Sequence, residues 1–426
     1  MSRAEKFDYS GETRMARMVQ FDGRPVWAEV SLGALAHNLR EIRRHIRGLV
    51  PNGSPDAFTA SGSSRTSSAR GAKRKILAVV KGNAYGHGIV PVARALGRAG
   101  ADWFGVTCSA EGMELRESGV RGPVLLLTGF WTGEERRILD NHLTPAITQI
   151  EQLRWLERAA ARARGRRKPV EFHLKIDSGM NRLGLGPGEI PAFASAMTDC
   201  PHLRLGGAFT HLASSEDHST EQAIEQEKMF RGALDCLRAR GFDPGIVHLA
   251  NSGAIASRPS TWADMVRPGA MLYGYHQFFE PAERTPEIER QIPLRPVLAF
   301  RARIISLRDV PAGGSVGYNA RWTAARASRI AVIAAGYADG VARVLTNRGK
   351  VIVRGQFAPI VGSVSMDLTM ADVTDIPAVR LGDTATIFGS DGDARQRVSD
   401  VARIAETASA ALLCGIGKRV PRFYLS

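Results

Sequence analysis

Cysteine is scarce in this sequence, and the patterns that cysteines usually form are missing. The chain contains only four cysteines, Cys108, Cys200, Cys236 and Cys414, and no Cys-x-x-Cys pair. Spacing this wide excludes a dense disulfide framework and the common cysteine zinc sites. We therefore expect four reduced thiols.

Long apolar runs are missing as well. No stretch of about 18 uncharged apolar residues occurs, so we expect no membrane-spanning helix. The first 25 residues mix basic side chains with Glu5, Asp8, Glu12 and Asp22 and have no apolar core. We therefore predict a mobile tail over residues 1–25 rather than a signal peptide, and a cytoplasmic location.

Acidic residues are outnumbered by basic ones, 42 against 57, which gives a formal net charge of +15. Such an excess is typical of proteins that bind nucleic acid, because basic clusters attract phosphate backbones. Here most arginines are scattered, and the local clusters at residues 71–75 and 154–168 offer no series of interleaved aromatic residues for stacking bases. Solvated surface is the better interpretation. An anionic partner remains the lesser alternative, and we predict no nucleic-acid partner.

The composition suits a large globular protein, because 44% of its 426 residues are hydrophobic, and this length favours two domains. Apolar residues at helical spacing predict a first helix between Leu32 and Ile46. Residues 48–74 are rich in Pro, Gly, Ser and Thr, with almost no periodic apolar residue. They predict a flexible insertion that the fold does not need.

Short apolar runs then alternate with amphipathic stretches. This alternation is typical of a TIM-like (β/α)8 barrel or of a doubly wound open sheet, and the number of runs, eight, favours the α/β barrel. The predicted strands cover residues 76–81, 103–106, 124–127, 144–147, 171–176, 205–211, 247–250 and 265–273.

Beyond Pro293 the runs become rich in Val, Ile and Thr and are divided by glycine turns, which predicts a mostly antiparallel β-domain. Its predicted strands include residues 329–335, 350–353, 360–364 and 385–388. A polar, proline-containing linker at residues 280–292 separates the two domains. The resulting domains are 26–285 and 286–426, and we expect residues 26–31 to pair with the second.

In a barrel, chemistry gathers at the C-terminal ends of the strands. Five predicted strands end in polar groups: Lys81 with Tyr85, Lys175 with Asp177 and Arg182, His211, Asn251 with Ser252, and Arg267. A single lysine at a strand end is most often only solvated. Several such groups converging on one face favour a functional site.

Other common types of active site are excluded because their sequence motifs are missing. The sequence has neither a Gly-x-Ser-x-Gly elbow nor a Walker phosphate loop, and no carboxylates accompany His211 and His218 at metal-ligand spacing. The remaining inventory is a lysine able to form a Schiff base, glycine-rich turns suited to a phosphate, and several arginines. That inventory fits pyridoxal 5'-phosphate.

These residues lie within a longer series of ordered motifs. From Trp27 to Tyr424 the chain resembles alanine racemase, through residues 81–88, 175–184, 210–214, 248–252, 267–269, 316–318, 336–340, 365–367 and 419–422. The resemblance implies a barrel that binds pyridoxal phosphate, followed by a β-domain. It also implies a head-to-tail homodimer in which each active site includes residues of the partner's β-domain.

By this resemblance, Lys81 is the Schiff-base lysine and the base for one face of the substrate α-carbon. Tyr318, from the other subunit, is the base for the opposite face. Two opposed bases are what racemisation requires, because the α-carbon loses a proton on one side and gains one on the other.

The resemblance also implies roles around the cofactor ring. Arg267 faces the pyridine nitrogen, and because it can only donate, the nitrogen stays neutral and the cofactor is a weaker electron sink than in aminotransferases. His248 supports Arg267, while His211 packs against the ring and helps to orient Tyr318.

The remaining implied roles concern anions. Arg182 contacts the phenolic oxygen of the cofactor and the substrate carboxylate. Met366 of the partner chain binds the same substrate carboxylate through its backbone amide. Lys175 corresponds to a lysine that the family often carries as a carbamate. Asp367 has a supporting role. The cofactor is further held, mainly at its phosphate, by Tyr85, Asn251, Ser252, Gly269 and Ala270.

One position departs from the family pattern. Ala410 stands where the family usually has a tyrosine that contacts the phosphate and narrows the substrate pocket. The missing hydrogen bond would weaken cofactor binding by about 1.5 to 3 kcal/mol, less any replacement by water.

The primary hypothesis is interconversion of L- and D-alanine, supplying D-alanine for peptidoglycan. A racemase of serine or larger amino acids is the main alternative, because Ala410 leaves room for them. A decarboxylase of the same architecture is disfavoured by the presence of Tyr318, and a non-catalytic cofactor carrier is disfavoured by the separate β-domain.

Overall fold

The computed structural model describes residues 24–48, 74–163, 168–280 and 282–426. Residues 1–23 of the predicted tail and residues 49–73 of the predicted insertion lie outside these residues. The end of the tail prediction is wrong, because Arg24 and Pro25 are bound to the β-domain: Arg24 donates to the Ala334 carbonyl and the Pro25 carbonyl accepts from the Arg303 amide. The described chain divides into two compact units. One contains the residues up to Leu32, Tyr85–His87 and Pro296–Ser426, and the other contains the remaining residues from Gly33 to Arg295.

The second unit contains an eight-stranded parallel sheet in the order β8-β7-β6-β5-β4-β3-β2-β9. Its strands are β2 (Lys75–Val79), β3 (Trp103–Val106), β4 (Val124–Leu126), β5 (Thr144–Ile147), β6 (Val170–Lys175), β7 (Leu203–Phe209), β8 (Ile246–His248) and β9 (Met265–Val266). All eight overlap predicted runs, but the strand predicted at residues 265–273 is confirmed only at Met265–Val266, because Ala270–Tyr273 form a 3-10 helix. Most of their residues are buried on both faces, as is usual for parallel strands covered by helices.

Hydrogen bonds between the first and last parts of this sheet nearly close it into a barrel. β9 pairs with β2, and the Arg267 amide donates to the Ala250 carbonyl at 2.9 Å, while the Asp264 amide donates to the Val247 carbonyl at 3.1 Å. The predicted barrel is therefore confirmed.

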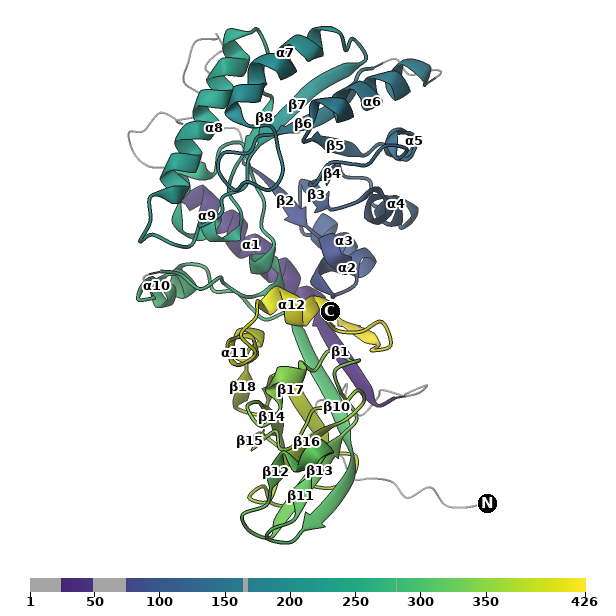
Figure 1. Cartoon of the computed structure of the whole chain (residues 1–426), viewed down its shortest axis with the longest axis vertical. Helices are drawn as coiled ribbons and strands as arrows, with labels where there is room; N and C mark the ends of the chain where they lie inside the picture. Colours follow the sequence, from purple (N-terminus) through teal and green to yellow (C-terminus); the bar gives the residue numbers. More distant parts are fainter. Residues whose placement is uncertain (1–23, 49–73, 164–167, 281) are drawn as a thin grey trace. The chain divides into compact units, whose positions relative to one another are not determined.

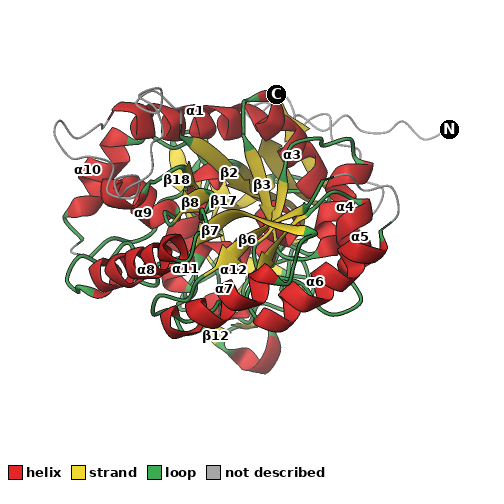
Figure 2. Ribbon diagram, turned by 90° about the horizontal axis from the view of Figure 1, so that it is seen from above, coloured by secondary structure: helices red, strands yellow, loops and turns green. Residues whose placement is uncertain are grey.

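Helices surround these strands (Figure 2). They are α1 (Leu32–Gly48), α3 (Ile89–Arg98), α4 (Ser109–Glu117), α5 (Glu135–Asp140), α6 (Ile150–Arg162), α7 (Ile190–Thr198), α8 (Gln222–Ala239), α9 (Ser252–Ser257) and α10 (Arg284–Gln291). In α1 the buried residues include Leu35, Leu39, Ile42 and Ile46, so the predicted apolar stripe is the face that packs. No described helix is long and apolar enough to cross a membrane.

The barrel unit continues beyond the predicted boundary at residue 285. The predicted linker contains α10, whose Ile288 is buried, and Arg295 is still tied to α1. The Asn38 side chain accepts from the Arg295 amide at 2.7 Å and donates to its carbonyl at 2.8 Å. This paired contact explains why the unit ends at Arg295 rather than ten residues earlier.

The other unit is built on a nine-stranded sheet whose pairs are antiparallel apart from β1 with β19. The strands are β1 (Val26–Ser31), β10 (Leu298–Val310), β13 (Ser328–Ile333), β14 (Lys350–Val353), β15 (Gln356–Pro359), β16 (Thr369–Asp372), β17 (Thr384–Asp391), β18 (Ala394–Gln396) and β19 (Arg422–Leu425). β1 runs between β10 and β19 (Figure 1), so residues 26–31 do pair with this sheet. The mostly antiparallel β-domain is confirmed.

Smaller elements complete this unit: the hairpin of β11 (Ser315–Val316) and β12 (Trp322–Thr323), and the helices α11 (Val398–Ile404) and α12 (Ser409–Cys414). The prediction of a strand at residues 360–364 is wrong, because the structure has no strand there. Ile360 forms only an isolated bridge, and Gly362 has a φ of +72°. A Cβ at Gly362 would lie 2.6 Å from the Val316 carbonyl oxygen, so this close approach requires glycine and interrupts the extended chain.

Candidate active site

Five basic side chains gather where the barrel strands end: Lys81, Lys175, Arg182, His211 and Arg267. Burial, followed by the charges of Arg267, Arg182 and Lys81, lowers the pKa of Lys175 to about 8, and Asp177 only partly opposes this shift. Burial and the same charges lower the pKa of His211 to about 3. A buried excess of positive charge favours an anionic ligand at this place.

Lys81 begins a short left-handed turn, α2 (Lys81–Tyr85). Strand β2 ends at Val79, so the lysine follows the strand rather than ending it as predicted. Gly82, Asn83 and Ala84 all have φ between 53° and 64°. For a residue other than glycine, this conformation costs about 1–2 kcal/mol. The surrounding structure must therefore hold the turn in place.

Glu111, at the start of α4, is one group that holds it. Its carboxylate accepts hydrogen bonds from the amides of Gly82 at 2.6 Å and Asn83 at 3.4 Å, and from the Thr107 amide after β3 at 2.9 Å. The Asn83 side chain in turn accepts from the Ile89 amide at the start of α3, at 2.8 Å. The sequence contained no local signal for Glu111.

Arg267 is buried and surrounded by acceptors. It donates to the carbonyls of Thr210, His248 and Leu249 at 2.7–2.9 Å, and to the His248 Nδ1 atom at 3.1 Å. Burial lowers its pKa, but these acceptors favour the charged form. The predicted contact between His248 and Arg267 is therefore present.

A second buried histidine continues this chain of contacts. The His248 Nε2 atom lies 2.8 Å from the His173 Nδ1 atom. Burial lowers the pKa of both rings, that of His173 to about 3, so both are neutral. Because Arg267 can only donate, Nδ1 of His248 is the acceptor and its Nε2 carries the proton. His173 was not identified from the sequence, because its contact with His248 joins two strands that are far apart along the chain.

Arg182 lies on a loop that one carboxylate organises. Asp177 accepts from the amides of Gly179, Met180, Asn181 and Arg182 at 2.9–3.0 Å. Burial opposes ionisation, but these amides lower the pKa of Asp177. Asp177 therefore fixes the backbone from which Arg182 extends.

The predicted phosphate-binding residues form a second polar group. The Ser252 hydroxyl accepts from the amides of Gly269 at 3.0 Å and Met271 at 3.4 Å. Within the part of the chain that the structure describes, the Ala270 amide has no acceptor. Asn251 caps α9 through the Ala254 amide at 3.0 Å, which indicates a structural contribution.

The other predicted residues, Tyr85, Tyr318, Met366 and Asp367, belong to the compact unit of the β-domain. Burial and then the charge of Cys414 raise the pKa of Tyr85 to about 12. Tyr318 is 71% exposed and Met366 53% exposed. Both side chains are therefore accessible on the surface of this unit.

Sequence comparison assigns both parts of the chain. The family pattern described as alanine racemase, N-terminal domain, matches residues 56–277, and the one described as alanine racemase, C-terminal domain, matches residues 297–424. The chain belongs to the alanine racemase family. A relative from Geobacter sulfurreducens named alanine racemase is 40% identical over 95% of this chain and 98% of its own length.

Solved structures of the alanine racemase family have the same fold. The biosynthetic alanine racemase of Pseudomonas aeruginosa is 32% identical with a TM-score of 0.79, covering 95% of this chain and all of its own. The alanine racemase of Bartonella henselae, described with covalently bound pyridoxal phosphate, is 27% identical with a TM-score of 0.78, covering 95% of this chain and 100% of its own.

Proposed function

We propose that this protein interconverts L- and D-alanine, with pyridoxal 5'-phosphate as its cofactor. The observation that carries the proposal is the gathering of Lys81, Lys175, Arg182, His211 and Arg267 at the strand ends of a barrel of this family. A decarboxylase of the same architecture is disfavoured by the presence of Tyr318 as a second base.

The residues present fit the cofactor. Excess positive charge suits its phosphate, the Ala270 amide and the Ser252 hydroxyl are suitable phosphate ligands, and Lys81 supplies the amine for covalent attachment. Tyr85 is proposed as a further phosphate ligand. When bound, pyridoxal phosphate withdraws electrons from the substrate and makes its α-hydrogen acidic.

Arg267 is proposed to face the ring nitrogen and Arg182 the phenolic oxygen. Arg267 is held by carbonyl oxygens and by a neutral His248, so it donates hydrogen bonds and retains its protons. A partner that does not release a proton leaves the ring nitrogen neutral. Reaction is thereby directed to proton exchange at the α-carbon.

Two bases exchange that proton. We assign one face of the α-carbon to the Lys81 amine and the other to the Tyr318 hydroxyl of a second copy of the chain. A catalytic base works in a site from which water is excluded, so its side chain must be buried in the active form. Tyr318 is 71% exposed in the single chain, which supports burial of this side chain by a partner subunit. The proposed active form is therefore a homodimer with shared sites, in which Arg182 and the partner's Met366 bind the substrate carboxylate.

Ala410 supports broader specificity as a second candidate function. It lies half-buried in α12, where a methyl group replaces the usual phenol. Serine or larger amino acids would then be accepted beside alanine. We place the reaction in the cytoplasm, where D-alanine is supplied for peptidoglycan.

The decisive experiment follows each amino acid in deuterated water with the cofactor-loaded protein. Proton NMR should show loss of the α-hydrogen of alanine, and a chiral assay should show both enantiomers. Lys81→Ala should abolish both signals. If alanine were among the poorest substrates, the broader racemase would be the correct assignment, and an absence of exchange with every amino acid would indicate a cofactor carrier.

A further inference from the structure

The turn that carries Met366 is in direct backbone contact with a second turn of the β-domain. The amides of Tyr337 and Ala338 donate to the carbonyls of Ser365 and Met366, each at 3.0 Å. A Cβ added to Gly336 would lie only 2.4 Å from the Met366 carbonyl, so no larger residue fits there. The second turn therefore determines where the Met366 turn lies.

Asp339, in this second turn, is completely buried. Its carboxylate accepts from the Gly336 amide at 2.9 Å and from two nitrogens of Arg419, Nε at 2.7 Å and Nη2 at 3.0 Å. Pairing of this kind compensates for the desolvation of a buried carboxylate. It ties the second turn to the C-terminal segment.

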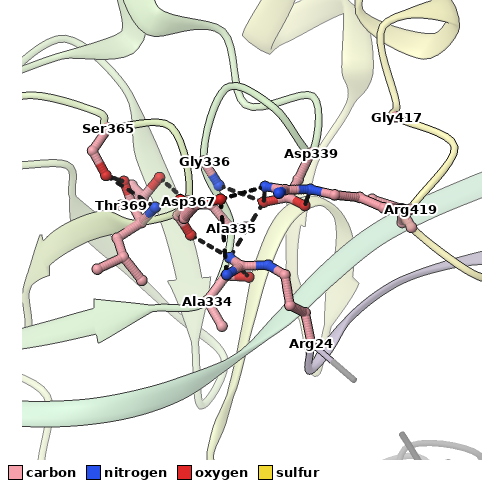
Figure 3. Close-up of polar contacts among 12 residues, drawn as sticks. Arg24, Ala334, Ala335, Gly336, Asp339, Ser365, Asp367, Thr369, Gly417 and Arg419 are labelled. Atoms are coloured by element: carbon pink, nitrogen blue, oxygen red, sulfur yellow. Dashed lines mark hydrogen bonds and ion pairs between the residues drawn. The ribbon is translucent and has the colours of Figure 1, made fainter. Parts of the chain in front are cut away.

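The same arginine reaches the Met366 turn. Arg419 Nη2 donates to the Asp367 side chain at 2.7 Å, and Arg24 donates to the Asp367 carbonyl and lies 3.5 Å from Asp339. Figure 3 shows the two arginines and two carboxylates pointing toward one another. We call Arg24, Asp339, Asp367 and Arg419 the Asp339 cluster.

We infer that the Asp339 cluster is a positioning device that aims the Met366 amide at the substrate carboxylate. Hydrogen bonds hold the carbonyls of Ser365 and Met366, and they hold both the carbonyl and the side chain of Asp367. The Met366 amide, in contrast, has no acceptor among the described residues. Three consecutive residues are thus held while one donor stays available, which is the arrangement that a fixed anion contact needs.

This inference rests on the proposed function and adds residues to it. The substrate carboxylate keeps its charge throughout racemisation, so the Met366 amide binds ground state and transition state equally. Weakening such a contact raises KM and leaves kcat nearly constant. A general loss of folding would not separate the two constants in this way.

The test is Asp367→Asn, which keeps the shape of the side chain and removes the charge that Arg419 binds. We expect KM for alanine to rise about fivefold, with kcat changed by less than about twofold. Asp375→Asn is the matched control, because it breaks the exposed pair of Arg326 with Asp375 in the same unit and should leave both constants unchanged.

Hydrogen exchange provides a readout that does not depend on turnover. The amides of Tyr337 and Ala338 should exchange faster in Asp367→Asn than in the wild type or in Asp375→Asn. If the wild type failed to racemise alanine, the proposed function would be wrong, while these amides would still test the cluster. Unchanged exchange, or a loss of kcat at constant KM, would overturn the inference.

Discussion

Lys175 is an amine in surroundings that disfavour an ammonium ion. Burial and three neighbouring cations lower its pKa from 10.5 to about 8. Because the pKa is lowered, the neutral amine becomes the major form as the pH rises through about 8, whereas an ordinary lysine remains protonated there. A neutral amine reacts with carbon dioxide, and the resulting carbamate would supply the negative charge that this cluster lacks.

We therefore predict that Lys175 carries a carbamate whose occupancy increases as the pH rises through about 8. Carbon-13 NMR of the protein with labelled bicarbonate should show the signal, and Lys175→Arg should remove it because its guanidinium stays protonated. Lys168→Arg, at an exposed lysine, is the control and should retain it. A signal that persists in Lys175→Arg would assign the carbamate elsewhere.

For single residues, the sequence was sufficient to identify the site residues that lie inside contiguous motifs. It could not locate Glu111 or His173 as supporting groups. Glu111 meets the Gly82 amide 29 positions away, and His173 meets His248 75 positions away. Motifs record neighbours along the chain, whereas these contacts arise only after the strands have formed the barrel.

The left-handed turn after β2 has an unfavourable backbone conformation, with positive φ angles at Gly82, Asn83 and Ala84. Hydrogen bonds to Glu111 offset part of the conformational free energy that this turn costs. Replacing Glu111 by alanine removes the acceptor for three backbone amides. We expect Glu111→Ala to lower the free energy of unfolding by about 2–4 kcal/mol. We also expect kcat to fall at least about tenfold, because Lys81 loses its fixed position.

Denaturant unfolding and steady-state kinetics measure the two effects. Glu114→Ala is the matched control, since Glu114 is exposed on the same helix. Glu111→Gln should recover part of the stability, because its amide oxygen still accepts. Equal behaviour of the Glu111 and Glu114 variants would show that the turn is held by other groups.

The elements also show where sequence reasoning succeeds. Parallel strands covered on both faces give uninterrupted apolar runs, so each of the eight barrel strands overlaps a predicted run, although the last prediction extended into the 3-10 helix at Ala270–Tyr273. An apolar run can equally be a buried loop, as at residues 360–364, where Gly362 turns the chain. The left-handed turn at Lys81 was not predictable, because Asn83 and Ala84 adopt it only through tertiary contacts.

At the scale of the whole molecule, the two proposed bases lie in separate compact units, Lys81 in the barrel unit and Tyr318 in the β-domain unit. If each active site combines Lys81 of one chain with Tyr318 of its partner, variants of the two residues must complement each other. Homodimers of Lys81→Ala and of Tyr318→Phe each lack a base in both sites and should be inactive. A mixed dimer has one site with neither base and one site with both.

Co-expression of the two variants with different affinity tags tests this arrangement. Random assembly makes half of the dimers mixed, each with one intact site, so the total activity should recover to about a quarter of the wild type. Doubly purified mixed dimers should reach about half. Recovery is impossible if Lys81 and Tyr318 of the same chain share a site, because each chain of the mixed dimer then still lacks one base. Mixed dimers that stay inactive would thus place both bases in one chain.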